Sequence, residues 1–229
     1  MAQISTSMMS TVALQRLAQM SLPAGADRNR LNSFVSGVSN AIGRAIQTWQ
    51  SQASLVDVTI NGPIATGGKL NGPPLQALIL AHCPAGFDEY AQPVSAGLHN
   101  AFASFQREVR VPGLPWYPAF AAFPGPMAPP MPNVPSPLMT LCPTAVRFVK
   151  EADIATAIIA KYRQPTPSCG NEVAKAVAAG VEKALFPWLA ATLVQGVMGS
   201  GPIPTFAPPY VPVGPVVNGR GMMPPGGLR

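Results

Sequence analysis

Apolar side chains recur at helical spacing in three stretches of the chain. Within each stretch most of them fall three or four residues apart, which keeps them on one face of a helix. The three stripes are Phe34, Val38, Ile42 and Trp49, then Val94, Leu98, Phe102 and Phe105, then Val177, Val181, Leu185 and Trp188. The pattern predicts three amphipathic helices, each with one buried face.

A proline-led turn precedes each of these helices. Each turn ends on an Asp or Asn, whose side-chain oxygen can accept a hydrogen bond from a free amide of the first helical turn. The three expected N-caps are Asp27, Asp88 and Asn171. A further helix is predicted before each turn, near residues 7–20, 75–83 and 145–162.

The three helices share a short core that reads Gly, aliphatic, two polar residues, Ala and a large apolar residue. It occurs at 37–42, 97–102 and 180–185, and each helix is followed by an uncharged segment that reaches Gly-Pro and then Ile or Met. We interpret this as a repeat that occurs three times. The predicted units are 1–74, 75–143 with a proline and aromatic arm at 111–143, and 144–229 with a Pro/Gly-rich arm at 201–229.

These features predict a mainly α fold with long irregular Pro/Gly-rich extended arms and three degenerate helix-pair repeats. Three related helix pairs could close into a pseudo-threefold body or stack into a linear array. The unequal spacing of the shared core along the chain favours the compact, pseudo-threefold body.

Composition changes the picture of the surface. Apolar residues make up 48% of the 229 residues, charged residues only 10%, and 28 residues are proline. Disordered chains are poor in apolar residues and rich in charge, so simple disorder is a poor explanation. Low charge gives little protection against association. We therefore expect a protein whose surface is largely buried against other subunits, including copies of itself.

The proline-rich arms are the strongest candidates for such contacts. Residues 111–146 and 184–219 carry no charge, and burying a large aromatic side chain is worth about 1.5–3 kcal/mol. Proline lowers the entropy that an extended segment loses when it is immobilised. The predicted assembly-interface residues are Trp116, Tyr117, Phe120, Phe123, Phe206 and Tyr210.

No motif in the sequence predicts reaction chemistry or a binding site for a cofactor, metal or small-molecule substrate. The run 66–70, TGGKL, lacks the Ser or Thr of a phosphate loop, and His82 and Cys83 are helical neighbours that point apart. The three cysteines form no CxxC pair, which favours free thiols in a reducing compartment. The net charge of +6 is spread singly rather than gathered in a patch, so nucleic-acid binding is not expected.

The N-terminal residues lack the basic region and apolar core of a signal peptide, so synthesis in the cytoplasm is expected. Pro187 interrupts the most apolar window, which argues against a spanning helix. In composition the chain is similar to minor structural proteins of bacteriophage virions and phage-tail-like contractile particles. This analogy implies a non-enzymatic subunit that clamps its neighbours. The alternatives are a membrane-associated or channel-forming assembly component, a scaffold presenting proline-rich ligands and, last, an enzyme of unrecognised type.

Overall fold

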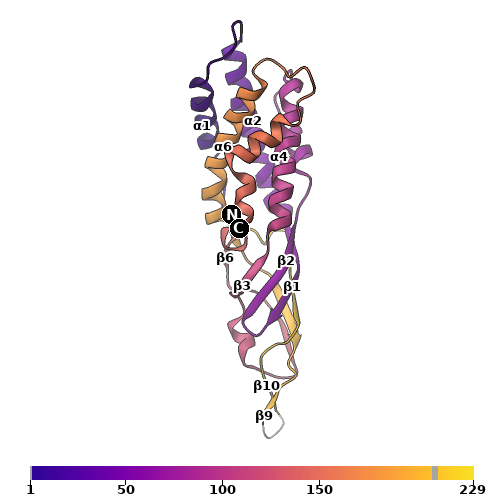
Figure 1. Cartoon of the computed structure of the whole chain (residues 1–229). Helices are drawn as coiled ribbons and strands as arrows, with labels where there is room; N and C mark the ends of the chain where they lie inside the picture. The colour runs from indigo at the N-terminus through magenta and orange to yellow at the C-terminus, as the bar shows by residue number, and fades with distance from the viewer. Residues whose placement is uncertain (1, 208–210) are drawn as a thin grey trace.

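The molecule is elongated, with helices at one end and strands at the other (Figure 1). The computed structural model describes residues 2–207 and 211–229. Within these ranges it contains six α-helices, α1 (Thr6–Ala18), α2 (Arg28–Gln52), α3 (Leu75–Leu80), α4 (Asp88–Glu108), α5 (Glu151–Ile159) and α6 (Gly170–Ala191). Both chain ends lie near the junction between the helical end and the strands.

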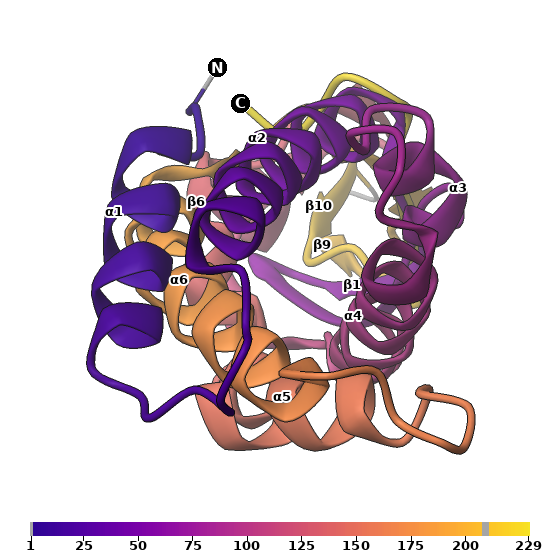
Figure 2. The ribbon, with the colours of Figure 1, turned by 90° about the horizontal axis from the view of Figure 1, so that it is seen from above.

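The helices form a closed ring when seen down the long axis (Figure 2). Each helix packs against the helices before and after it in sequence, and α1 closes the ring by packing against α6. Large aromatic side chains fill the centre, where the Trp49 ring lies 4.8 Å from Phe102 at 89° and 6.5 Å from Trp188. All three side chains are buried, so the apolar stripes read from the sequence do face the core.

The expected helices are present, except that the one expected at 145–162 is divided into a 3-10 helix (Ala145–Val149) and α5. Only the first expected N-cap is confirmed. The Asp27 carboxylate accepts a hydrogen bond from the Arg30 amide at 2.9 Å. Helix α4 begins at Asp88 itself, after Phe87, and α6 begins after Cys169, which has a φ of 62°. Asp88 and Asn171 therefore lie inside the first turns, and neither side chain caps its helix.

The other half of the molecule is built on a six-stranded antiparallel sheet with strand order β3-β2-β1-β11-β8-β5. Its strands are β1 (Ser54–Asn61), β2 (Ile64–Asn71), β3 (Val111–Pro115), β5 (Met127–Met131), β8 (Met198–Pro202) and β11 (Gly219–Met223). Strands β1 and β2 form a hairpin that turns at Gly62, whose φ is 57°. Glycine adopts such a φ without steric cost.

The predicted mainly α fold is wrong, because the segments read as irregular arms contribute strands to the main sheet. The chain is mixed α/β, with 49% helix and 20% strand. The 201–229 segment supplies β11 at the middle of the sheet, and the 111–143 segment supplies both edge strands, β3 and β5. The three predicted repeats therefore occupy unequal positions, and degenerate helix-pair repeats do not describe the fold.

Short elements complete the structure. A three-stranded sheet, β4 (Phe123–Pro124), β10 (Val211–Gly214) and β9 (Phe206–Ala207), lies at the end farthest from the helices (Figure 1). Nearer the helices, β6 (Ser136–Pro137) pairs with β7 (Leu193–Val194). The connections include three 3-10 helices, η1 (Pro118–Ala121), η2 (Leu138–Leu141) and η3 (Ala145–Val149).

Hydrogen bonds join segments at the two edges of the main sheet. The Trp116 amide, just after β3, donates to the Pro63 carbonyl at 2.6 Å, and the Trp116 carbonyl accepts from the Val134 amide at 3.0 Å. Across the interior, the Tyr117 hydroxyl donates to the Val197 carbonyl at 2.6 Å. The sheet thus encloses an apolar interior of its own, continuous with the helical core.

Candidate assembly interface

The aromatic residues predicted as interface contacts lie mostly inside the chain. Trp116, Tyr117 and Phe120 are 0%, 3% and 0% exposed. The Tyr117 and Phe120 rings stack at 5.2 Å and 6°, and Phe123 meets Phe120 edge-on at 6.4 Å. In this structure the first three side chains are covered by the protein itself and are not available to a partner, whereas Phe123 is partly exposed.

The other two predicted contacts lie at the distal tip. Phe206 begins β9, and Tyr210 lies outside the described residues. We define the tip as η1, β4, β9, β10 and the described segments that connect them, residues 116–126, 203–207 and 211–218. Five of the six predicted contacts lie at the tip or its base, although among them only Phe123 has a side chain that is described as partly exposed.

The tip carries no charged residue, and this separates it from the rest of the surface. Most charged residues belong to the helical end, and the strand half has only Asp57, Lys69, Arg110, Arg220 and Arg229. The exposed side chains of η1 and β4 and their surroundings are Pro118, Ala119, Ala121, Ala122, Pro124 and Pro126. Water can be removed from such a surface without desolvating a charged group. Desolvation of charge is the costly part of burying a protein surface.

A second surface is the outer face of the main sheet, where the usual alternation is reversed. Along β8 and β11 four of the five buried positions are glycines, Gly199, Gly201, Gly219 and Gly221, and the fifth is Met223; the outward positions hold Met198, Ser200, Pro202, Arg220 and Met222. Met198 and Met222 are paired across the two strands and are 40% and 54% exposed. At the edge of the sheet Met127 is 61% exposed. Sheets usually place such side chains toward the core.

A groove crosses this outer face between β1, β11 and β8. It has a volume of about 620 Å³ and is lined by Asp57, Thr59, Met198, Ser200, Arg220 and Met222 together with neighbouring backbone. Sequence reasoning missed these residues. The signal was present in 198–202 and 219–223, where glycine occupies positions 199, 201, 219 and 221, but glycine gives no hydrophobic alternation to read.

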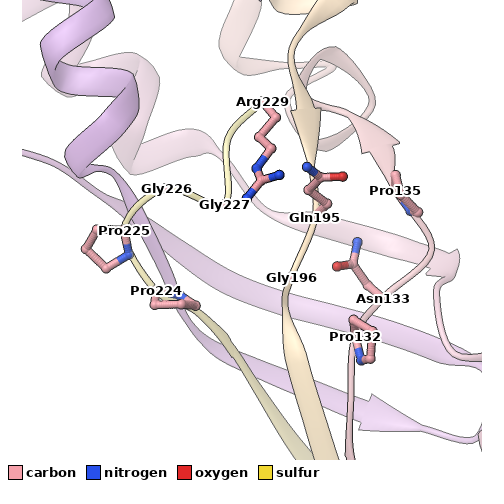
Figure 3. Close-up of a pocket in the computed structure, with 10 residues that line it drawn as sticks. All are labelled: Pro132, Asn133, Pro135, Gln195, Gly196, Pro224, Pro225, Gly226, Gly227 and Arg229. Carbon is pink, nitrogen blue, oxygen red and sulfur yellow. The ribbon is translucent and has the colours of Figure 1, made fainter. Parts of the chain in front are cut away.

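A third hollow lies where the C-terminal residues meet β7 and the segment after β5. Figure 3 shows Pro224 and Pro225 on one side of it and Pro132, Asn133 and Pro135 on the other. The Asn133 side chain is engaged internally, because its oxygen accepts from the Val197 amide at 2.9 Å and its nitrogen donates to the Val194 carbonyl at 3.0 Å. Arg229 is the one charged side chain among the residues that line this hollow.

The segments considered above for phosphate binding or nucleophilic catalysis lie in surroundings that do not favour that chemistry. The run 66–70 lies in strand β2, and its Lys69 pairs with Asp57 at 3.2 Å. Burial, and then the charge of Asp88, raise the pKa of the Cys83 thiol to about 11, which disfavours a nucleophilic thiolate. Two carboxylates outside these segments, Glu89 and Glu151, form ion pairs with Arg30 and Arg16 at the surface.

Two further observations concern ligands and membranes. Across residues 2–207 and 211–229, no cluster of three or more His, Cys, Asp or Glu side chains could hold a metal ion. Of the described helices, none combines the length and apolar character needed to span a bilayer.

No protein-family model, curated protein or solved structure matches this chain. The uncharged tip and the methionine-bearing sheet face are therefore the features on which a functional proposal can rest.

Proposed function

We propose that this protein is a non-enzymatic structural subunit of a large ordered assembly, of the kind found in bacteriophage virions or phage-tail-like contractile particles. In this proposal the uncharged tip seats in a neighbouring subunit, and the charged helical end stays at the solvated side. The observation that supports it is the separation of charge along an elongated molecule, with most of the charged residues at the helical end and none at the tip.

The physical argument concerns the cost of removing water from the tip. Burying apolar surface contributes about 25 cal/mol per Å², and the gain is easily lost if a charge is buried unpaired. The tip exposes prolines and alanines, and proline has no amide hydrogen that would need a new partner. Seating the tip against another protein therefore leaves few polar groups unsatisfied.

The tip is also held in shape before any partner binds. Trp116, Tyr117 and Phe120 fill its base, and the Val216 amide donates to the Phe120 carbonyl at 3.0 Å. A preformed contact surface loses less conformational entropy on association than a segment that must order itself. The buried aromatic residues thus support the proposed contact from beneath.

The proposal is tested by placing charge on the tip. The double variant Ala119→Asp and Ala122→Asp adds two carboxylates at exposed positions, and Ala18→Asp adds one at an exposed position of α1 as a matched control. Each tagged full-length chain is expressed in its source cells, and lysates are fractionated by rate-zonal sedimentation and viewed by negative-stain electron microscopy. We expect the unaltered protein and the control in fast-sedimenting ordered particles, and the tip variant in slow fractions.

Unaltered protein found entirely as a slow-sedimenting free species would overturn the proposal. So would a tip variant that enters particles as well as the control does. Flotation of the purified protein with neutral phosphatidylcholine vesicles separates the membrane-associated alternative. If the protein floats and the tip variant does not, the tip contacts lipid rather than protein.

A further inference from the structure

We infer that the groove on the outer face of the main sheet is a docking surface for the same groove on a second copy of this chain. This contact is separate from the tip, so it extends the assembly role to another surface and can fail independently of it. The inference rests on the reversed alternation of the strands, the proline-blocked edges and the charges within the groove.

Because the alternation is reversed, apolar side chains of β8 and β11 are exposed on the outer face of the sheet. Met198 and Met222 lie side by side on β8 and β11, and the backbone beneath them is glycine packed directly against the interior. A Cβ at Gly199 would overlap the Ile60 side chain, and one at Gly221 would press on Ile60 and Val197. At these two glycine positions the strands lie so close to the interior that a larger inward side chain would not fit. Unbranched, polarisable methionine adapts to the surface of a partner.

The edges of the sheet are poor places for a partner. Edge strand β5 contains Pro129 and Pro130, and edge strand β3 contains Pro112 and Pro115. Prolines lack the amide donors that an added strand would need, and prolines at sheet edges commonly prevent edge-to-edge pairing. A partner of this sheet is thus expected to bind across its face.

The charged side chains in the groove favour a second copy of this chain as the binding partner. Arg220 is exposed and lies opposite Thr59 in the β1–β11 register, with Ser200 on its other side. No ion pair involves Arg220 within the part of the chain that the structure describes. Asp57 lines the same groove and pairs with Lys69, in a contact where both side chains are about two-thirds exposed.

Among the described residues that line the groove, Arg220 has no ion pair and Asp57 has a weak one, so the groove is complementary to itself. In a two-fold contact residue i of one copy meets residue j of the other, and j meets i. Arg220 of each copy would then meet Asp57 of the other, giving two equivalent ion pairs flanked by the methionines. The exposed Asp57–Lys69 pair within each copy competes only weakly with the contact between copies, because exposed ion pairs contribute about 0–1 kcal/mol.

Charge reversal tests the pairing directly. Arg220→Asp places two anions in the groove, and Asp57→Lys places two cations there, so each variant should weaken self-association by about ten-fold or more through like-charge contacts. Sedimentation-velocity centrifugation of the full-length protein from about 1 to 100 µM, a range set by ordinary association constants, gives the dimer dissociation constant. Lys183→Glu, at an exposed position of α6, is the matched control and should dimerise as the unaltered protein does.

The decisive measurement mixes the two reversed variants. Arg220→Asp and Asp57→Lys should each be largely monomeric alone and should form a heterodimer when mixed, because each then meets an opposite charge at both pairs. The double variant within one chain should also recover dimerisation. Asp57 has a φ of 58°, which disfavours Lys, so folding is checked by circular dichroism. Asp57→Asn, which tolerates this backbone, supplies a second variant expected to weaken the dimer.

Several results would overturn the inference. They are a full-length protein that stays monomeric at the highest concentration, reversed variants that dimerise normally, and a mixture that remains monomeric. The tip variant Ala119→Asp and Ala122→Asp should retain the dimer. If that variant loses the dimer while Arg220→Asp keeps it, self-association belongs to the tip and the sheet-face contact is refuted.

Discussion

The indole Nε1 of Trp188 donates a hydrogen bond to Oε1 of Gln50 over 3.0 Å in the buried core. The Gln50 amide nitrogen in turn donates to the Leu228 carbonyl at 3.3 Å. One glutamine therefore joins α6, α2 and the C-terminal segment, and Leu228 bridges to Val194 of β7. This short chain of hydrogen bonds ties the helical end to the strand half.

Replacing Gln50 by Leu should destabilise the fold. The substitution keeps much of the side-chain volume but leaves the buried Trp188 N–H without a partner, which costs about 1–3 kcal/mol. Urea unfolding followed by tryptophan fluorescence measures the change in free energy. Gln52→Leu, at an exposed position of the same helix, is the control and should change stability little. Equal effects of the two substitutions would show that the Gln50 bonds are not stabilising.

The shared glycines of the helices mark close approaches between neighbouring elements. A Cβ at Gly180 would overlap the Met9 carbonyl oxygen of α1, and one at Gly97 would overlap the Ile158 backbone of α5. Backbone atoms cannot step aside as a flexible side chain can, so Ala at either position forces the helices apart. Overpacking of this kind costs about 1–3 kcal/mol, more than the roughly 1 kcal/mol that Ala gains in helix propensity.

We therefore expect Gly180→Ala and Gly97→Ala to lower the thermal midpoint, measured by circular dichroism at 222 nm. Gly37→Ala is the graded control, because its Cβ would meet only the Pro84 ring, at 2.9 Å. Its loss should be smallest of the three. A Gly180→Ala variant as stable as the unaltered protein would show that α1 can shift outward without cost.

The helices could be predicted because their signals are local. The three- and four-residue spacing of Val177, Val181 and Leu185 depends only on residues that are near in sequence. The sheet could not be predicted in this way, since Leu55 pairs with Met223 across most of the chain and glycine fills four of the five inward positions of β8 and β11. The prolines of β5 suggested an irregular arm, yet proline is compatible with an edge strand, where its missing amide needs no partner.

The candidate interface was predicted in part. Sequence reasoning identified the uncharged segments and their aromatic residues, and the structure places much of them at one end of the molecule. It also buries Trp116, because the segment after β3 closes over the sheet through the Val134–Trp116 hydrogen bond. Burial of this kind depends on tertiary pairing. The open face with Met198 and Met222 was missed for the same reason.

Alkaline pH should weaken the fold through buried acidic groups that are neutral when folded. Burial raises the pKa of the Cys142 thiol from 9.0 to about 12, and burial also raises the pKa of the Tyr117 hydroxyl. A raised folded-state pKa gives stability that is fully present below the unfolded pKa and is lost as pH rises above it. The free energy of unfolding, measured with urea and a reductant, should therefore fall between pH 9 and pH 12.

The Cys142→Ala variant shows how much of the decrease in the free energy of unfolding at alkaline pH comes from the Cys142 thiol. The variant loses the weak hydrogen bond from Sγ to the Leu138 carbonyl at 3.2 Å, so its stability at pH 7 should be somewhat lower. Its decline with pH should nevertheless be shallower than that of the unaltered protein. Parallel declines would mean that Cys142 does not contribute to the pH dependence.

The cap of α2 provides a comparison between two positions that looked equivalent in the sequence. The Asp27 carboxylate accepts from the Arg30 amide at 2.9 Å, whereas Asn171 lies one residue inside α6 and makes no capping bond. Asp27→Ala should therefore cost about 1 kcal/mol, the usual value of a side-chain N-cap, and Asn171→Ala should be near neutral. Both residues are exposed, so packing contributes little to either change. Urea unfolding of the two variants measures the difference, and equal losses would mean that the Asp27 hydrogen bond does not stabilise the helix.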